Sequence, residues 1–252
     1  MRTIPAKAAL IVLALAATTP AGCQSEGRTA PTPSSTTPTA SPLSSGASPA
    51  RNGIEALSAA EILRRAKAAL LEAKSFRAKG TLHQGGERTT IDLKVSGRSF
   101  SASWSFGPAT VELLSTGGKR YLRPDKQFWI MSTDTRRGTI LARAMGDRWV
   151  TGADKDPAFA DLFAIGSLDG LFRPRRFDIG AVKEIAGVEA VGIMDFDDIE
   201  KKLFVAAIGK PYPLLLTGKE GSELVFTDFG ATIANPAAPA ESRVVNIDEL
   251  AG

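Results

Sequence analysis

Downstream of residue 53, the spacing of apolar residues first predicts a helix. Ser58 and Glu61 fit a capping box, in which the serine caps the helix and the glutamate reaches back, and Leu57 and Ile62 fit a hydrophobic staple. Apolar residues then recur at intervals of four, four and three, which places them on one face of the helix: Ile62, Ala66, Leu70 and Ala73. We expect the helix to run to about Lys74.

From residue 75 the apolar period changes to two, which predicts antiparallel strands. In "SFSASWSF" (99–106) serine occupies every odd position and an apolar residue every even one. Glycine-containing turns separate the strands, at "QGGE" (84–87), "SGRS" (96–99) and "TGGK" (116–119). Each strand therefore has one polar and one apolar face, as in antiparallel sheets that are covered on one side.

The rest of the chain mixes short elements of both kinds. We expect strands at Tyr121 and at 128–131, a helix over 134–145, a strand fragment at 148–152, and a helix over 156–163. Further strands are expected near 182–193, 203–208, 213–217 and 222–229. The fold class is α+β: a curved antiparallel sheet of roughly nine to twelve strands, whose apolar face is covered by short helices. Large aromatics opposite a helix with an alanine-rich face indicate either close packing or a cavity.

The N-terminal residues predict a lipoprotein signal peptide over 1–22, followed by a cysteine that carries the lipid. Arg2 and Lys7 precede an apolar run of ten residues, "AALIVLALAA" (8–17), which is too short to span a membrane. Small residues then precede Cys23, the only cysteine of the chain. The segment is similar to the lipobox of bacterial lipoproteins, although Pro20 stands where an aliphatic residue is usual. The alternative is an ordinary signal peptide with a cysteine near the cleavage site.

Residues 24–52 have the composition of a disordered tether. Ser, Thr, Pro, Ala and Gly dominate the segment, which contains no aromatic residue and one large aliphatic residue, Leu43. Such a segment does not bury enough apolar surface to offset the entropy of ordering. We therefore divide the chain into a signal peptide (1–22), a lipidated cysteine with its tether (23–53) and a folded domain (54–252).

Charge and motifs exclude several functions for the domain. The chain carries 31 basic and 27 acidic residues, of which residues 1–53 hold four and one, so the domain is close to neutral and gives no reason to expect nucleic-acid binding. Nucleophile and phosphate-loop motifs are absent from the sequence, and a single histidine, His83, leaves a catalytic triad or zinc site without partners. We predict no enzyme activity, no metal site and no cofactor.

Two charged segments have a structural and a functional interpretation. "DFDDIE" (195–200) is expected to be a solvated turn rather than a site for a hard cation, because it lacks the spacing of a calcium loop. "RPRRF" (173–177) places Arg173, Arg175 and Arg176 either in a solvated loop or against a phosphate headgroup. Trp104, Trp129 and Trp149 are expected in the core.

Taken in order along the chain, these features resemble a known family. The lipobox, the tether and the capped helix are followed by "SFRAKGTL" (75–82), "VELLSTGGKRYLR" (111–123) and "VFTDFGATIANPAAP" (225–239). The set resembles actinobacterial lipoproteins of the LppX/LprG type, within the wider LolA-like fold. The resemblance implies a half-barrel closed by helices over an apolar cavity that takes the acyl chains of a lipid or of a lipoprotein.

Under this resemblance we expect an extracytoplasmic protein, anchored to the outer face of the cell membrane through Cys23, that carries lipid within the envelope. The alternating face then supplies the cavity lining: Leu82, Ile91, Leu93, Phe100, Trp104, Phe106, Val111, Leu113, Leu141 and Met145. Trp104 is expected opposite Leu93 and Val111 or Leu113. The second hypothesis is an envelope sensor of the same fold, which binds a protein partner and transports no ligand.

Overall fold

The computed structural model describes residues 50–84, 87–152, 157–172 and 176–247. The predicted signal peptide, Cys23 and almost all of the tether lie outside these residues, as do Arg173 and Arg175. At the start of the described chain, Asn52 donates from its backbone N–H to the carbonyl of Ala207 at 2.8 Å, and Arg51 bridges to Ile208. Within the described ranges, no helix combines the length and the apolar character that crossing a membrane requires.

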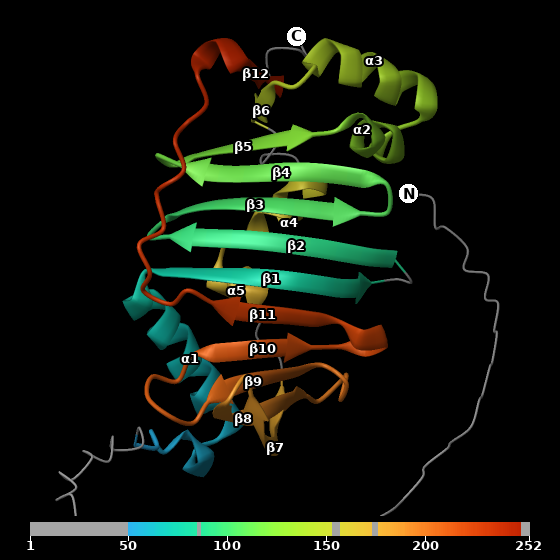
Figure 1. The fold of residues 1–252 in the computed structure, drawn as a ribbon. Helices are drawn as coiled ribbons and strands as arrows, with labels where there is room; N and C mark the ends of the chain where they lie inside the picture. Colours follow the sequence, from blue (N-terminus) through green and yellow to red (C-terminus); the bar gives the residue numbers. More distant parts are fainter. Residues whose placement is uncertain (1–49, 85–86, 153–156, 173–175, 248–252) are drawn as a thin grey trace, which may run out of the picture. The chain divides into compact units, whose positions relative to one another are not determined.

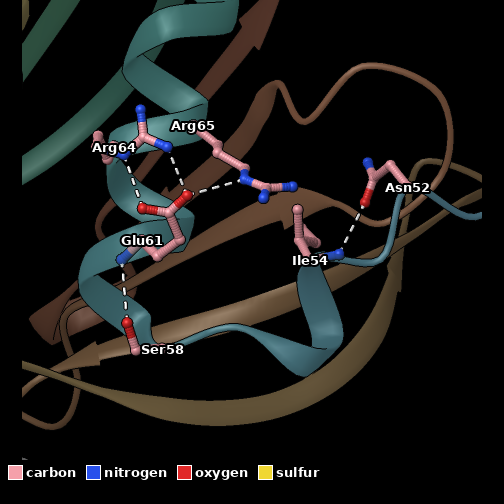
Figure 2. Close-up of polar contacts among 6 residues, drawn as sticks. All are labelled: Asn52, Ile54, Ser58, Glu61, Arg64 and Arg65. Carbon is pink, nitrogen blue, oxygen red and sulfur yellow. Dashed lines mark hydrogen bonds and ion pairs between the residues drawn. The ribbon is translucent and has the colours of Figure 1, made fainter.

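The predicted first helix, α1 (Ala59–Ala73), is present, and its N-terminus forms half of the expected capping box. The Ser58 hydroxyl accepts from the Glu61 backbone N–H, but the Glu61 carboxylate turns the other way (Figure 2). It accepts from Arg64 Nε at 2.7 Å and from Arg65 Nε at 3.0 Å instead of from the Ser58 backbone, so that part of the prediction is wrong. These hydrogen bonds, chiefly the one from Arg64, lower the pKa of Glu61 to about 2.

Twelve strands of the described chain form one curved sheet that does not close on itself (Figure 1). Six belong to the first half of the domain: β1 (Ser75–Gln84), β2 (Glu87–Ser96), β3 (Ser99–Phe106), β4 (Ala109–Thr116), β5 (Lys119–Pro124) and β6 (Trp149–Thr151). Six follow: β7 (Phe177–Ile185), β8 (Val188–Asp195), β9 (Lys202–Ala206), β10 (Pro213–Thr217), β11 (Glu223–Thr227) and β12 (Val244–Asn246). Every pairing is antiparallel except that of β12 with β6.

The sheet consists of two series of neighbouring strands, one from β1 to β6 and one from β7 to β11, which meet where β1 pairs with β11. From one edge to the other the strand order reads β12-β6-β5-β4-β3-β2-β1-β11-β10-β9-β8-β7, so that β1 pairs on one side with its neighbour in sequence and on the other with β11. After β11, residues 228–243 run along one end of the strands and bring the chain to the opposite edge of the sheet (Figure 1). Ser75 and Ser96 hold this segment by donating to the carbonyls of Ala231 and Ile233 at 2.7 and 3.0 Å.

Short helices cover the inner face of the sheet. They are α2 (Lys126–Ser132), α3 (Thr135–Met145), α4 (Pro157–Ala164) and α5 (Leu168–Leu171), and together with α1 they contribute to one hydrophobic core. In Figure 1, α4 and α5 lie behind the sheet. The predicted fold class, an α+β half-barrel closed on its apolar face by short helices, is therefore confirmed.

One predicted strand is a helix. Residues 128–131 fall in α2, because β5 ends at Pro124 and Asp125 caps a helix: Asp125 Oδ1 accepts from the Phe128 N–H at 2.7 Å. The apolar run that suggested a strand buries Phe128 and Trp129 on one side of this helix. Gly138 of α3 packs against its backbone, with space too small for a Cβ beside Ile130.

The alternation had predicted a uniformly polar outer face of the sheet. The structure differs, because this face also carries buried apolar side chains. Leu114 and Tyr121 point to the opposite side from Leu113 and Leu122, yet each is only 5% exposed. Trp149 also lies on this side, half-buried, beside Pro236 and Ala237 of the segment that follows β11. Trp149 had been predicted to lie in the core. It is instead part of a small outer cluster and does not belong to the main core.

Candidate ligand-binding site

The middle of the inner face is a continuous row of packed side chains. Strand pairing aligns one residue from each of seven neighbouring strands, and none of them is more than 6% exposed: Phe226, Ala78, Leu93, Ala102, Leu113, Leu122 and Val150. Leu93 has no exposed surface at all. The middle of the inner face is therefore almost completely buried.

One row further along the strands, the pairing corrects the expected neighbours of Trp104. Trp104 lies opposite Ile91 on β2 and Val111 on β4, while Leu93 and Leu113 flank Ala102. Gly80 completes this row on β1, opposite Ile91 and Leu224. The missing side chain at Gly80 lets β1 and β11 approach closely at this level.

In the next row, at the end of the strands, Thr89 and Ala109 are buried, and only the two large apolar side chains are half-buried. Leu82 and Phe106 lie in this row, and both pack against the core while keeping part of their surface exposed. Trp104, Phe106, Phe128 and Phe159 form a chain of rings, with centroids 6.5 Å apart for Trp104–Phe106, 5.9 Å for Phe106–Phe128 and 6.0 Å for Phe128–Phe159. We call these four residues the aromatic end of the inner face.

The structure brings the ten predicted lining residues onto this one face or its helical cover. Six belong to the buried core: Ile91, Leu93, Phe100, Val111, Leu113 and Met145. Four are half-buried against it: Leu82, Trp104, Phe106 and Leu141. Sequence analysis missed Phe159 and Phe128, because both lie on short helices whose direction the alternation of strands does not reveal.

Two indole nitrogens near the aromatic end are buried without a partner. The Nε1 atoms of Trp104 and Trp129 have no hydrogen-bond acceptor among the described atoms. A buried N–H without a partner is costly, by roughly 1–3 kcal/mol. A water molecule or an oxygen of a bound ligand would satisfy either group.

The other polar residues that the sequence analysis singled out make contacts within the fold. Arg176 is exposed and its guanidinium lies 4.5 Å from the ring centroid of Phe196, in a cation–π contact. His83, the last residue but one of β1, is half-buried, and its backbone N–H donates to the Ser222 hydroxyl at 2.7 Å. In "DFDDIE", Asp195 is fully buried rather than solvated and accepts from the Asp197 N–H at 3.0 Å. The described residues contain no group of three or more potential metal ligands.

An ion pair on the outer face makes the stability of the sheet depend on pH. Arg77 of β1 donates to Asp92 of β2, with Nε 2.9 Å from Oδ1, and this contact lowers the pKa of Asp92. Because the folded-state pKa is depressed, the pair stabilises the fold above the ordinary pKa of aspartate and loses this effect as the pH falls through the folded-state value.

Asp92→Asn is therefore expected to lower the free energy of unfolding by up to about 1 kcal/mol near neutral pH, and by much less near pH 2. Urea denaturation at both pH values measures the difference. Asp178→Asn, at an exposed position on β7, is the control and should behave alike at both. An equal loss at both pH values for Asp92→Asn would show that the charge of Asp92 does not stabilise the fold.

Comparisons with known proteins do not assign a function to this chain. No protein-family model matches the sequence, and no curated protein matches it. A crystal structure of an uncharacterized conserved protein from Thermus thermophilus is similar with a TM-score of 0.41 and 12% identity, over 75% of this chain and 98% of that one. MucB, in a crystal structure of its complex with MucA(peri), is similar with a TM-score of 0.30 and 17% identity, over 73% of this chain and 58% of that one.

Proposed function

We propose that the chain is an extracytoplasmic lipoprotein that is anchored through Cys23 and carries acylated molecules within the cell envelope, like the LppX/LprG-type proteins that its sequence resembles. The observation that supports the proposal is that side chains on the inner face become less buried from the middle of the strands toward their ends. The face is fully packed in its middle row, whereas Leu82, Trp104 and Phe106, nearer the strand ends, are half-buried and keep part of their apolar surface exposed.

Burial of alkyl groups supplies the binding energy in this proposal. Each buried CH₂ group contributes about 0.8 kcal/mol, so a few methylenes against the aromatic end outweigh any single polar contact. The unpartnered indole N–H of Trp104 gives the same region one donor for an ester or headgroup oxygen. A mostly apolar site with one or two polar groups is typical of small-molecule pockets.

The experiment that tests this function is lipid extraction from the full chain, purified from membranes in a mild detergent, with native mass spectrometry of the same sample. We expect a stoichiometric, extractable lipid in addition to the acyl groups that stay attached to the protein. A chain that carries no extractable lipid, but retains a protein partner through purification, would replace the carrier function with that of an envelope sensor.

Cys23→Ala is expected to abolish incorporation of a clickable palmitate analogue, because the thioether bond to the lipid needs the sulfur. At least two acyl chains are expected on Cys23, since a single chain gives only marginal membrane binding. In-gel fluorescence and salt-washed membrane fractions measure the two effects. Ser25→Ala is the matched control and should keep both the label and the membrane location. A Cys23→Ala chain that still takes up the label would exclude this anchor.

A further inference from the structure

The outer face of the sheet holds a hollow of about 370 Å³ that the lipid-binding proposal does not use. Its floor comes from β2, β3 and β4, and its walls from Trp149 of β6 and from Pro236 and Ala237 of the segment that crosses the strand ends. We call it the outer pocket. Its volume lies within the range of roughly 300–1,000 Å³ that is common for small-molecule sites.

The floor of the outer pocket is a row of polar side chains set by strand register. Asp92, Ser103 and Glu112 lie directly opposite one another on β2, β3 and β4. Lys94, Ser101 and the apolar Leu114 form the adjacent row on the same face. The even spacing follows from the pairing of the strands, and the serines come from the odd positions of "SFSASWSF".

Several polar atoms of this floor are available to a ligand. Both hydrogen bonds from Arg123 go to Oε2 of Glu112, so Oε1 has no partner among the described contacts. The hydroxyls of Ser101 and Ser103 have no described partner either. Together with the Lys94 ammonium, these atoms place acceptors and donors side by side on the floor of the outer pocket.

Charge in the outer pocket is almost fully compensated within the protein. Asp92 is held by Arg77, and Glu112 by Arg123, so each carboxylate already has its own guanidinium. Neither carboxylate needs a metal ion for compensation. Lys94 forms no described ion pair, but its charge also acts on Asp92 and contributes, after the hydrogen bond from Arg77, to the lowered pKa of that carboxyl. This arrangement favours a polar ligand without a large net charge.

The walls add an apolar surface to this polar floor. Arg123 lies 4.8 Å from the ring centroid of Trp149 and holds the half-buried indole beside Glu112. Pro236 and Ala237 supply small apolar groups across the pocket from the strands. The outer pocket therefore combines fixed, planar hydrogen-bonding groups with an aromatic wall.

We propose that the outer pocket binds a saccharide. A pyranose ring has hydroxyl groups around its edge and an apolar C–H face, so it matches a floor of serine, carboxylate and ammonium groups next to an indole. The free Glu112 Oε1 accepts from one sugar hydroxyl, and the Ser101 and Ser103 hydroxyls exchange hydrogen bonds with its neighbours. Trp149 covers the apolar face. This binding does not depend on the acyl-chain site, which lies on the other face of the sheet.

The test is a calorimetric titration of the full chain, purified in a detergent without a sugar headgroup, with maltotetraose and with chitotetraose. We expect saturable binding of at least one of these neutral oligosaccharides. Ser103→Trp fills the floor from an exposed position and should weaken binding about tenfold or more, which corresponds to about 1.4 kcal/mol. Thr90→Trp, also exposed and on the same face of β2 outside the pocket, is the matched control and should bind like the wild type.

A second variant and a second measurement separate binding from folding. Trp149→Leu keeps an apolar wall without the indole and should also lose affinity, while thermal melts report whether each variant folds. Extractable lipid should be unchanged in Ser103→Trp, so failure of the saccharide proposal is distinguishable from failure of the carrier function. The proposal is overturned if neither oligosaccharide binds saturably, or if a folded Ser103→Trp chain binds as tightly as the wild type.

Discussion

Replacing Gly80 with alanine is expected to lower the free energy of unfolding by about 3 kcal/mol or more. A Cβ at this position would lie 1.9 Å from the carbonyl oxygen of Glu223, far inside van der Waals contact. The obstacle is the backbone of β11, which pairs with β1 at Gly80 and Leu224. Because a backbone does not rotate away as a flexible side chain does, the two strands must separate.

Urea denaturation of wild type and Gly80→Ala measures this loss. Gly97→Ala is the matched control, because Gly97 has a φ of 60° but nothing lies within 4 Å of the place that a Cβ would take there. Its cost should be limited to the strain of the left-handed conformation, about 1 kcal/mol. Equal losses in the two variants would mean that β1 and β11 separate without penalty, and that the close approach at Gly80 does not matter for stability.

Phe106→Asp is expected to remove most of the extractable lipid, with a drop of about tenfold per protein molecule. Phe106 is half-buried between Trp104 and Phe128, at the point where the inner face is partly open. Losing contact with about two methylene groups already costs about 1.6 kcal/mol, and a carboxylate at the same place must also be desolvated. Quantitative mass spectrometry of the lipid extract measures the change.

Ser105→Asp introduces the same charge one residue away, on the polar face of β3, where Ser105 shares a hydrogen bond with Thr110. This control should keep the lipid content of the wild type. Leu93→Trp tests a different property, because Leu93 has no exposed surface and a larger side chain there probes core packing. If Phe106→Asp folds and retains its lipid, the aromatic end is not where the acyl chain binds.

The sequence allowed the first helix and the meander from β1 to β5 to be predicted, since both depend on local periodicity. The alternation in "SFSASWSF" places Phe100 and Ala102 on the buried side, as the structure shows. The capping box was only half right, because Arg64 and Arg65 follow on the same helix and compete for the Glu61 carboxylate. A pattern of residue types does not rank such competing partners.

Two other features could not be predicted from local patterns. The run 128–131 is compatible with either a strand or a helix, and the deciding contact is the cap from Asp125 together with the packing of Gly138 against Ile130. The burial of Leu114 on the outer face involves Pro236 and Ala237, which come more than a hundred residues later in the chain and line the same hollow. The polar residues of the outer pocket were visible in the sequence, but nothing local distinguishes them from an ordinary solvated face.

The position of β1 between β2 and β11 also has a consequence for the order of folding. The hairpins from β1 to β5, and those from β7 to β11, join strands that are adjacent in sequence, so each meander closes short loops at low entropic cost. The seam between β1 and β11 joins residues such as Ala78 and Phe226, which are far apart along the chain, and has to close a much longer loop. While the chain is being synthesised, β1 therefore presents an unpaired edge until β11 has emerged. During that interval the hydrogen-bonding groups of this edge are open to other extended chains, so β1 is a part of the nascent domain that needs protection from aggregation.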